Sequence, residues 1–135
     1  MKRALFILSI GLALLGTAAC GTPEYVEHSI DDICSSAETG DWVKVTGVIK
    51  PIDVIEYDRR YRVLLVKDLS QGQPCIGMWI PKGTGKHRMR PIADNFKWED
   101  VQIKAADGRM VGGGDMVTVY ATIRPGCELK TYMIE

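Results

Sequence analysis

The sequence predicts a mainly β domain with five strands and one short N-terminal helix. Along several short segments, apolar and polar residues alternate, as they do in strands with one buried face. Glycine and proline residues separate these segments, which is typical of turns between strands. The chain has 135 residues, and its Val, Ile, Leu and Met content is enough for one small core. We therefore expect a single domain.

The helix is expected first, over residues 29–36. Ser29 can cap its N-terminus, and Asp32 follows three positions later in the relation of a capping box. Gly40 marks the break after it.

The first strand is expected over residues 42–49, where Val43 and Val45 alternate with polar residues. Gly47 interrupts this pattern and indicates a bulge or a sharp bend. A polar loop through residues 53–60 should follow. The remaining strands are expected at residues 61–67, 75–80, 116–123 and 128–134.

The segment between the third and fourth strands predicts smaller elements. Residues 83–90 have the composition of a mobile basic loop, and residues 94–100 favour a helical turn. Residues 101–111 favour a small hairpin, because Asp107 and Gly108 form a preferred turn pair.

Residues 1–20 resemble the signal peptide of a bacterial lipoprotein. Lys2 and Arg3 supply the positive charge, residues 4–15 form an apolar run that is short for a membrane span, and small residues lead into Cys20. The resemblance implies removal of residues 1–19 and attachment of acyl chains, palmitate among them, to Cys20. Thr17 stands where this motif usually has Leu. Ordinary cleavage near residues 18–19 and an uncleaved anchor are the alternatives.

This leader implies an address in the cell envelope. Acyl chains on Cys20 would hold the chain on the membrane, outside the cytoplasm. Gly21 replaces the Asp associated with inner-membrane retention, so the outer membrane is expected where the organism has one. Residues 20–28 are interpreted as a tether and residues 29–135 as the domain. Acidic and basic residues number 17 each, so loss of Lys2 and Arg3 leaves a slightly negative chain without a field that attracts nucleic acid.

Residues 41–135 resemble the OB-fold, the small five-stranded Greek-key barrel that binds oligonucleotides and oligosaccharides, and within it the anticodon-binding-like group. The resemblance rests on the strand at residues 42–49, the strand at residues 61–68 that ends in an aspartate, and the segment at residues 114–119. An SH3-like or other small barrel is the alternative. The weak helix signal before the fourth strand departs from the OB pattern.

Three cysteines follow the leader, an odd number in a compartment that favours disulfides. One bridge and one free thiol are expected. The OB resemblance places Cys34, Cys75 and Cys127 at one end of the barrel and implies a bridge between Cys75 and Cys127. Cys34 with either of them is the runner-up, and three buried thiols are a further alternative.

The resemblance also implies a ligand on the outer face of the second and third strands. Trp79 and Tyr61 are expected to point outward there, where aromatic rings can stack on bases or sugars. A slip of one residue would instead turn Trp79 inward. Basic residues in the adjacent loops are candidates for contacts with anions, although basic loops are often merely solvated: Arg59, Arg60, Lys82, Lys86, Arg88, Arg90 and Arg124.

No catalytic constellation, metal site or cofactor motif is evident, because His28 and His87 are isolated and no cysteine has metal-ligand spacing. The sequence therefore favours a non-catalytic binding module on the membrane. Its ligand would be single-stranded nucleic acid, an envelope glycan or a protein segment. A structural or assembly lipoprotein acting through protein contacts is the alternative, and a small nuclease or hydrolase ranks third. The sequence does not define the oligomeric state.

Overall fold

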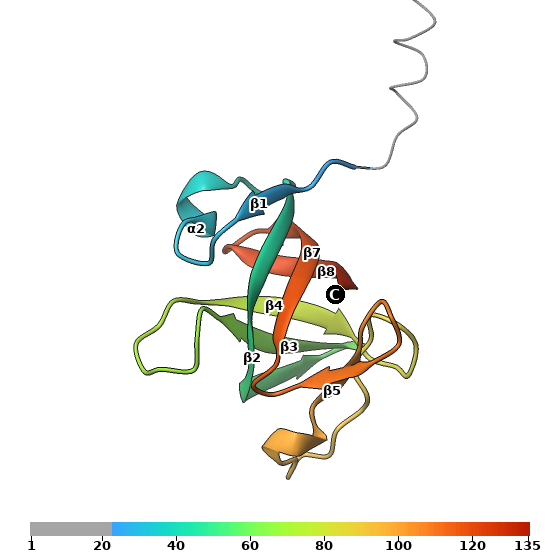
Figure 1. Ribbon diagram of the computed structural model, residues 1–135. Coiled ribbons are helices and arrows are strands. Elements are labelled where there is room, and N and C mark those ends of the chain that lie inside the picture. Colours follow the sequence, from blue (N-terminus) through green and yellow to red (C-terminus); the bar gives the residue numbers. More distant parts are fainter. Residues whose placement is uncertain (1–22) are drawn as a thin grey trace, which may run out of the picture.

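The computed structural model describes residues 23–135, which form a mainly β fold (Figure 1). The predicted signal peptide and the lipidation site at Cys20 lie outside the described residues. No helix among the described residues has the length and apolar character needed to cross a bilayer. The elements in chain order are β1 (Val26–His28), α2 (Ile33–Ser36), β2 (Trp42–Tyr57), β3 (Arg60–Val66), β4 (Cys75–Pro81), the 3₁₀ helix η1 (Trp98–Asp100), β5 (Gln102–Lys104), β6 (Met110–Gly112), β7 (Met116–Arg124) and β8 (Glu128–Ile134).

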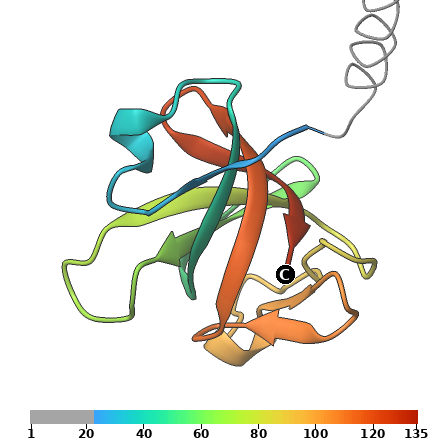
Figure 2. The same cartoon turned by 45° about the horizontal axis from the view of Figure 1, so that its top comes forward.

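Six strands form one sheet in the order β1-β2-β3-β4-β8-β7, and β2 also pairs with β7. The pairings therefore run in a ring through β2, β3, β4, β8 and β7. Both views show β2 and β7 side by side (Figures 1 and 2). β4 and β8 are parallel and pair over two residue pairs, whereas the neighbouring strands of the ring are antiparallel. β5 and β6 make a separate small hairpin.

The first long strand, β2, extends well beyond its predicted end. It pairs with β7 up to Val48 and continues along β3 to Tyr57, so the predicted polar loop shrinks to a turn at Asp58 and Arg59. Ladder hydrogen bonds to β3 thus override the polar composition of this segment. The irregularity expected at Gly47 lies instead between Lys50 and Ile55.

Gly47 serves close packing. A Cβ atom at this position would lie 2.7 Å from the Ile30 side chain and 2.8 Å from the Val66 carbonyl oxygen. The absence of a side chain therefore lets β2 approach the backbone of β3 and the Ile30 side chain closely.

The later strands agree with the prediction to within one or two residues at their ends, and β8 agrees at both ends. The hairpin of β5 and β6 and the turn at η1 lie where they were expected. The helix is shorter than predicted, because residues 29–32 form a turn in which the Ser29 hydroxyl donates to Asp32. β1 lies in the predicted tether, and it pairs in parallel with residues 43–45 of β2.

The core lies inside the ring of strands. Alternate residues of each strand point inward, as in Val43 and Val45 of β2, Val63 and Leu65 of β3, and Val119 of β7, all of which are fully buried. The hairpin and the 89–105 segment add further apolar side chains to the same core.

The disulfide joins Cys34 to Cys127, and the predicted bridge between Cys75 and Cys127 was wrong. The strand register explains the difference. Met78 lies opposite Leu129, so counting back two residues on each strand puts position 76, not 75, level with Cys127. α2 instead brings Cys34 to the turn after β7, with a Cα–Cα distance of 5.6 Å. Cys75 is free and exposed. All three cysteines nevertheless line one hollow, as the expected clustering required.

Candidate functional site

Trp79 projects from the outer face of β4, as predicted. Its neighbours Met78 and Ile80 are fully buried, whereas Trp79 is half-buried. The prediction for Tyr61 was wrong, because its side chain is only 2% exposed. Tyr61 belongs to the inward set of β3, and its hydroxyl accepts a hydrogen bond from the Ile92 amide at 3.0 Å. A tyrosine can be buried in this way when its hydroxyl finds a partner.

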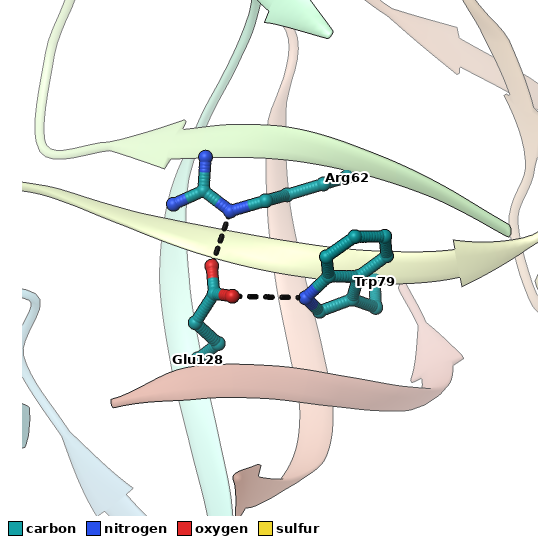
Figure 3. A network of polar contacts seen from close by, with 3 residues as sticks. All are labelled: Arg62, Trp79 and Glu128. Atoms are coloured by element: carbon teal, nitrogen blue, oxygen red, sulfur yellow. Dashed lines mark hydrogen bonds and ion pairs between the residues drawn. The ribbon is translucent and has the colours of Figure 1, made fainter. Parts of the chain in front are cut away.

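A polar network joins Trp79 to the two strands on either side of β4 (Figure 3). The Trp79 indole N–H donates to one carboxylate oxygen of Glu128 at 3.1 Å, and Arg62 Nε donates to the other. The Arg62 and Glu128 side chains are each 25% exposed, so the ion pair is less screened by solvent than a fully exposed pair. Both carboxylate oxygens are used, and the indole ring is held in one orientation.

The ion pair lies directly over Gly77 of β4. A Cβ atom added there would come within 2.5 Å of Glu128 Oε2 and 2.6 Å of Arg62 Cζ. Real Cβ atoms do not approach other atoms this closely, so glycine is what allows the pair to cross the strand. Gly77 therefore forms the floor of the network, that is, the part of β4 against which the Arg62 and Glu128 side chains pack.

A hollow of 410 Å³ lies beside Trp79 and Glu128. The turn after β2 contributes one wall and the turn after β7 contributes the other. The OB resemblance implies a face bordered by the loops after the first and fourth predicted strands and by the connection after the third. The first two of these line the hollow, and the connection after β4 does not. The lining residues are Tyr57, Asp58, Arg60, Trp79, Arg124, Pro125 and Glu128.

A second hollow, of 510 Å³, shares Trp79 and Glu128 with the first. It continues past Arg62 and Gly77 to the free Cys75 and the disulfide at Cys127. The network in Figure 3 thus stands between two adjoining depressions on one face of the sheet. An extended ligand crossing both would pass over the indole ring.

The structure brings two of the predicted basic residues to this face, Arg60 and Arg124. The other five predicted basic residues line neither hollow. Lys82 pairs with Glu56, whose hydrogen bond raises the pKa of the lysine, and lies 4.8 Å from the ring centre of Tyr61. Further along the same segment the exposed arginines make local hydrogen bonds, Arg88 to the Lys82 carbonyl and Arg90 to Gln102. Arg59 lies in the turn after β2, and Lys86 is exposed.

The lining residues that sequence reasoning missed include the polar and aromatic side chains of Tyr57, Asp58, Arg62 and Glu128. Tyr57 and Asp58 were assigned to a loop, and their role follows once β2 is extended to its true end. Glu128 had a usable signal, since it is the first residue of the strand after the turn at residues 125–127. Within residues 23–135, no three His, Cys, Asp or Glu side chains are grouped so that they could hold a metal ion.

No protein-family model and no curated protein matches this sequence. Among solved structures, one similar chain is described as OBody AM1L10 bound to hen egg-white lysozyme. The two chains are 15% identical with a TM-score of 0.48, and the match covers 85% of this chain and 95% of that chain. This likeness is too weak to assign a family. The comparisons thus give this mainly β protein a weakly similar structure and no family.

Proposed function

We propose that this protein is a lipid-anchored, non-catalytic binding module of the bacterial cell envelope, with an OB-like barrel that binds an extended glycan on its outer β3–β4 face. The ring of pairings supports the barrel, since five strands close on one another and β2 is shared by β3 and β7. The parallel contact of β4 with β8 also fits a Greek-key connection.

One observation carries the proposal of binding. The hollow beside Trp79 lies on the face, and between the two loops, that OB-folds use for ligands. Trp79 is fixed there before any ligand arrives, because Glu128 accepts its N–H. A side chain already held in its binding orientation loses little conformational entropy when a ligand docks.

The chemistry of the lining favours a glycan over a nucleic acid. Trp79 and the exposed Tyr57 offer apolar ring surfaces, Asp58 can accept hydrogen bonds from hydroxyl groups, and Arg60 and Arg124 can donate to oxygen atoms. The carboxylates of Asp58 and Glu128 offset the two arginines, so the lining has no excess of positive charge to attract phosphate groups. The chain also lacks the net positive charge that strengthens binding to nucleic acid.

The anchor and the location rest on the leader. Cys20 after three small residues is the pattern that directs acylation, and the disulfide between Cys34 and Cys127 fits an oxidising compartment outside the cytoplasm. Incorporation of labelled palmitate into the wild-type chain, and its loss in Cys20→Ser, tests the anchor. Signal cleavage without label would disprove it.

The binding proposal is tested by tryptophan fluorescence of the chain lacking residues 1–20. Peptidoglycan-derived oligosaccharides are titrated beside a single-stranded oligonucleotide, at low and moderate salt. Oligosaccharides should quench the emission, and Trp79→Phe should remove that part of the signal. Arg124→Ala should weaken binding about tenfold, as expected for loss of one charged hydrogen bond of roughly 1.4 kcal/mol.

Arg88→Ala is the matched control, because Arg88 is also an exposed arginine but lines neither hollow. Its affinity should equal that of the unmodified chain. Quenching by the oligonucleotide alone, weakening with salt, would replace the glycan with nucleic acid. No response to either ligand would refute the polymer-binding proposal and favour an assembly role through protein contacts.

A further inference from the structure

Four aromatic side chains that line neither hollow cluster on the outside of the sheet. We call them the aromatic face: Tyr25, Trp42, Tyr120 and Tyr132. Tyr25 makes edge contacts with Trp42 and Tyr120 at centroid distances of 5.5 and 5.0 Å. Trp42 lies 5.2 Å from Tyr132. The strands β2, β7 and β8 therefore present one continuous aromatic surface.

Strand alternation places these rings outside the core. Trp42 precedes the fully buried Val43, and Tyr120 lies between the buried residues Val119 and Ala121. Tyr132 is 42% exposed, and Val26 of β1 adds an exposed apolar side chain nearby in sequence to Tyr25. The other three rings are half-buried, so the cluster presents a partly exposed apolar surface, and such surfaces can mark an interaction site.

Lysines cover two of the rings, which argues against a stacking platform for bases or sugars. Lys44 Nζ lies 5.6 Å from the ring centre of Tyr120, and Lys130 Nζ lies 5.4 Å from that of Tyr132. A ligand would have to displace both ammonium groups to reach these ring faces. Aromatic rings with polar tips beside lysines are instead the side chains that settle at the level of lipid headgroups.

The aromatic face begins only a few residues after the predicted lipidation site, which would keep it close to the membrane. Tyr25 follows Cys20 by five residues, and a fully extended chain advances at most about 3.6 Å per residue, so the two positions lie within about 18 Å of each other. Figure 2 shows β1, which directly follows Tyr25, crossing beside β2 and β7. An acylated Cys20 would therefore hold the aromatic face close to the bilayer surface.

We infer that the aromatic face rests on the headgroup region of the bilayer to which Cys20 anchors the chain. This inference rests on the lipid anchor of the proposed function. The exposed Glu24 and Glu27 offset the lysine charge, so contact depends on ring burial and on hydrogen bonds to headgroups more than on net charge. Trp79 pairs with Lys130 in the sheet register, so the binding hollow would open beside the membrane surface.

The test uses the full acylated chain in vesicles that contain brominated lipids, which quench tryptophan on contact. Variants keep one tryptophan each: Trp79→Phe with Trp98→Phe keeps Trp42, and Trp42→Phe with Trp79→Phe keeps Trp98. Figure 1 places η1, which begins at Trp98, at the opposite end of the fold from β1. Trp42 should be quenched and blue-shifted, and Trp98 should be unaffected.

A matched pair of substitutions sharpens the result. Tyr132→Ser should reduce the quenching of Trp42, whereas Met110→Ser should not, because Met110 is a similarly exposed apolar residue of the β5–β6 hairpin, at the other end of the fold from β1. Flotation of the same vesicles reports the anchor separately. A chain that floats with Trp42 unquenched overturns the inference and leaves the anchor intact. A chain that fails to float overturns the anchor, and the inference falls with it.

Discussion

Gly77→Ala offers a sharp test of the Trp79 network, because the sign of its effect depends on the ion pair above it. The new Cβ would lie 2.5 Å from Glu128 Oε2 and 2.6 Å from Arg62 Cζ, so the pair must leave its position. Overpacking of this kind costs about 1–3 kcal/mol. Replacing glycine in a strand gains roughly 0.5–1 kcal/mol from reduced freedom of the unfolded chain. The net change should be a loss of about 1–2 kcal/mol of unfolding free energy.

The same substitution should become neutral or stabilising when Arg62 and Glu128 are both alanine. The three atoms nearest to the added Cβ all belong to these two side chains, so their removal opens the space. Urea unfolding of the four variants, followed by circular dichroism, gives the coupling free energy directly, and we expect about 2 kcal/mol. An equal loss of stability in both backgrounds would refute the assignment of Gly77 as the floor of the network.

Two further predictions concern the disulfide and His87. The double variant Cys34→Ser with Cys127→Ser opens a loop whose ends are 93 residues apart, and it should lower the free energy of unfolding in urea by about 4–5 kcal/mol. Cys75→Ser is the control and should change the stability little, because Cys75 is free. Equal losses in the two variants would contradict this prediction. Burial lowers the pKa of His87 below 6.5, and its Nδ1 accepts a hydrogen bond from the Ile134 N–H. The unfolded chain therefore takes up the proton before the folded chain does. Stability should fall as the pH drops through 6.5. His87→Asn should flatten the plot of Tm against pH, and an unchanged slope would contradict the assignment.

The strand pattern was predictable because burial imposes a period of two on the sequence. β8 and the inward set of β4 follow directly from that alternation. The far half of β2 was not predictable, because residues 50–57 are largely exposed and carry no such pattern. Pairing with β3 alone makes them a strand. β1 was not predicted either, because a strand of three residues is too short to show an alternating pattern.

The candidate site was predictable in its location and not in its chemistry. The outward direction of Trp79 followed from alternation along its strand, but the inward direction of Tyr61 depended on a register that the sequence left open. The prediction of the disulfide was also wrong by one residue, because Cys75 lies one position along β4 from the level of Cys127. Errors of one residue matter most in strands, since they exchange inside and outside.

The basic segment after β4 shows why composition alone misplaced the polar contacts. Five of the seven predicted cations lie outside the hollows, and three of those five already make contacts within the protein: Lys82, Arg88 and Arg90. Arg62 was overlooked, yet it orients Glu128, which in turn fixes Trp79. A binding face of this kind is defined by which side chains are held rigidly on strands and not by the density of charge in a loop. Such rigidity is consistent with the proposed glycan ligand, because an indole surface that is already in place can pack against the apolar face of a sugar ring.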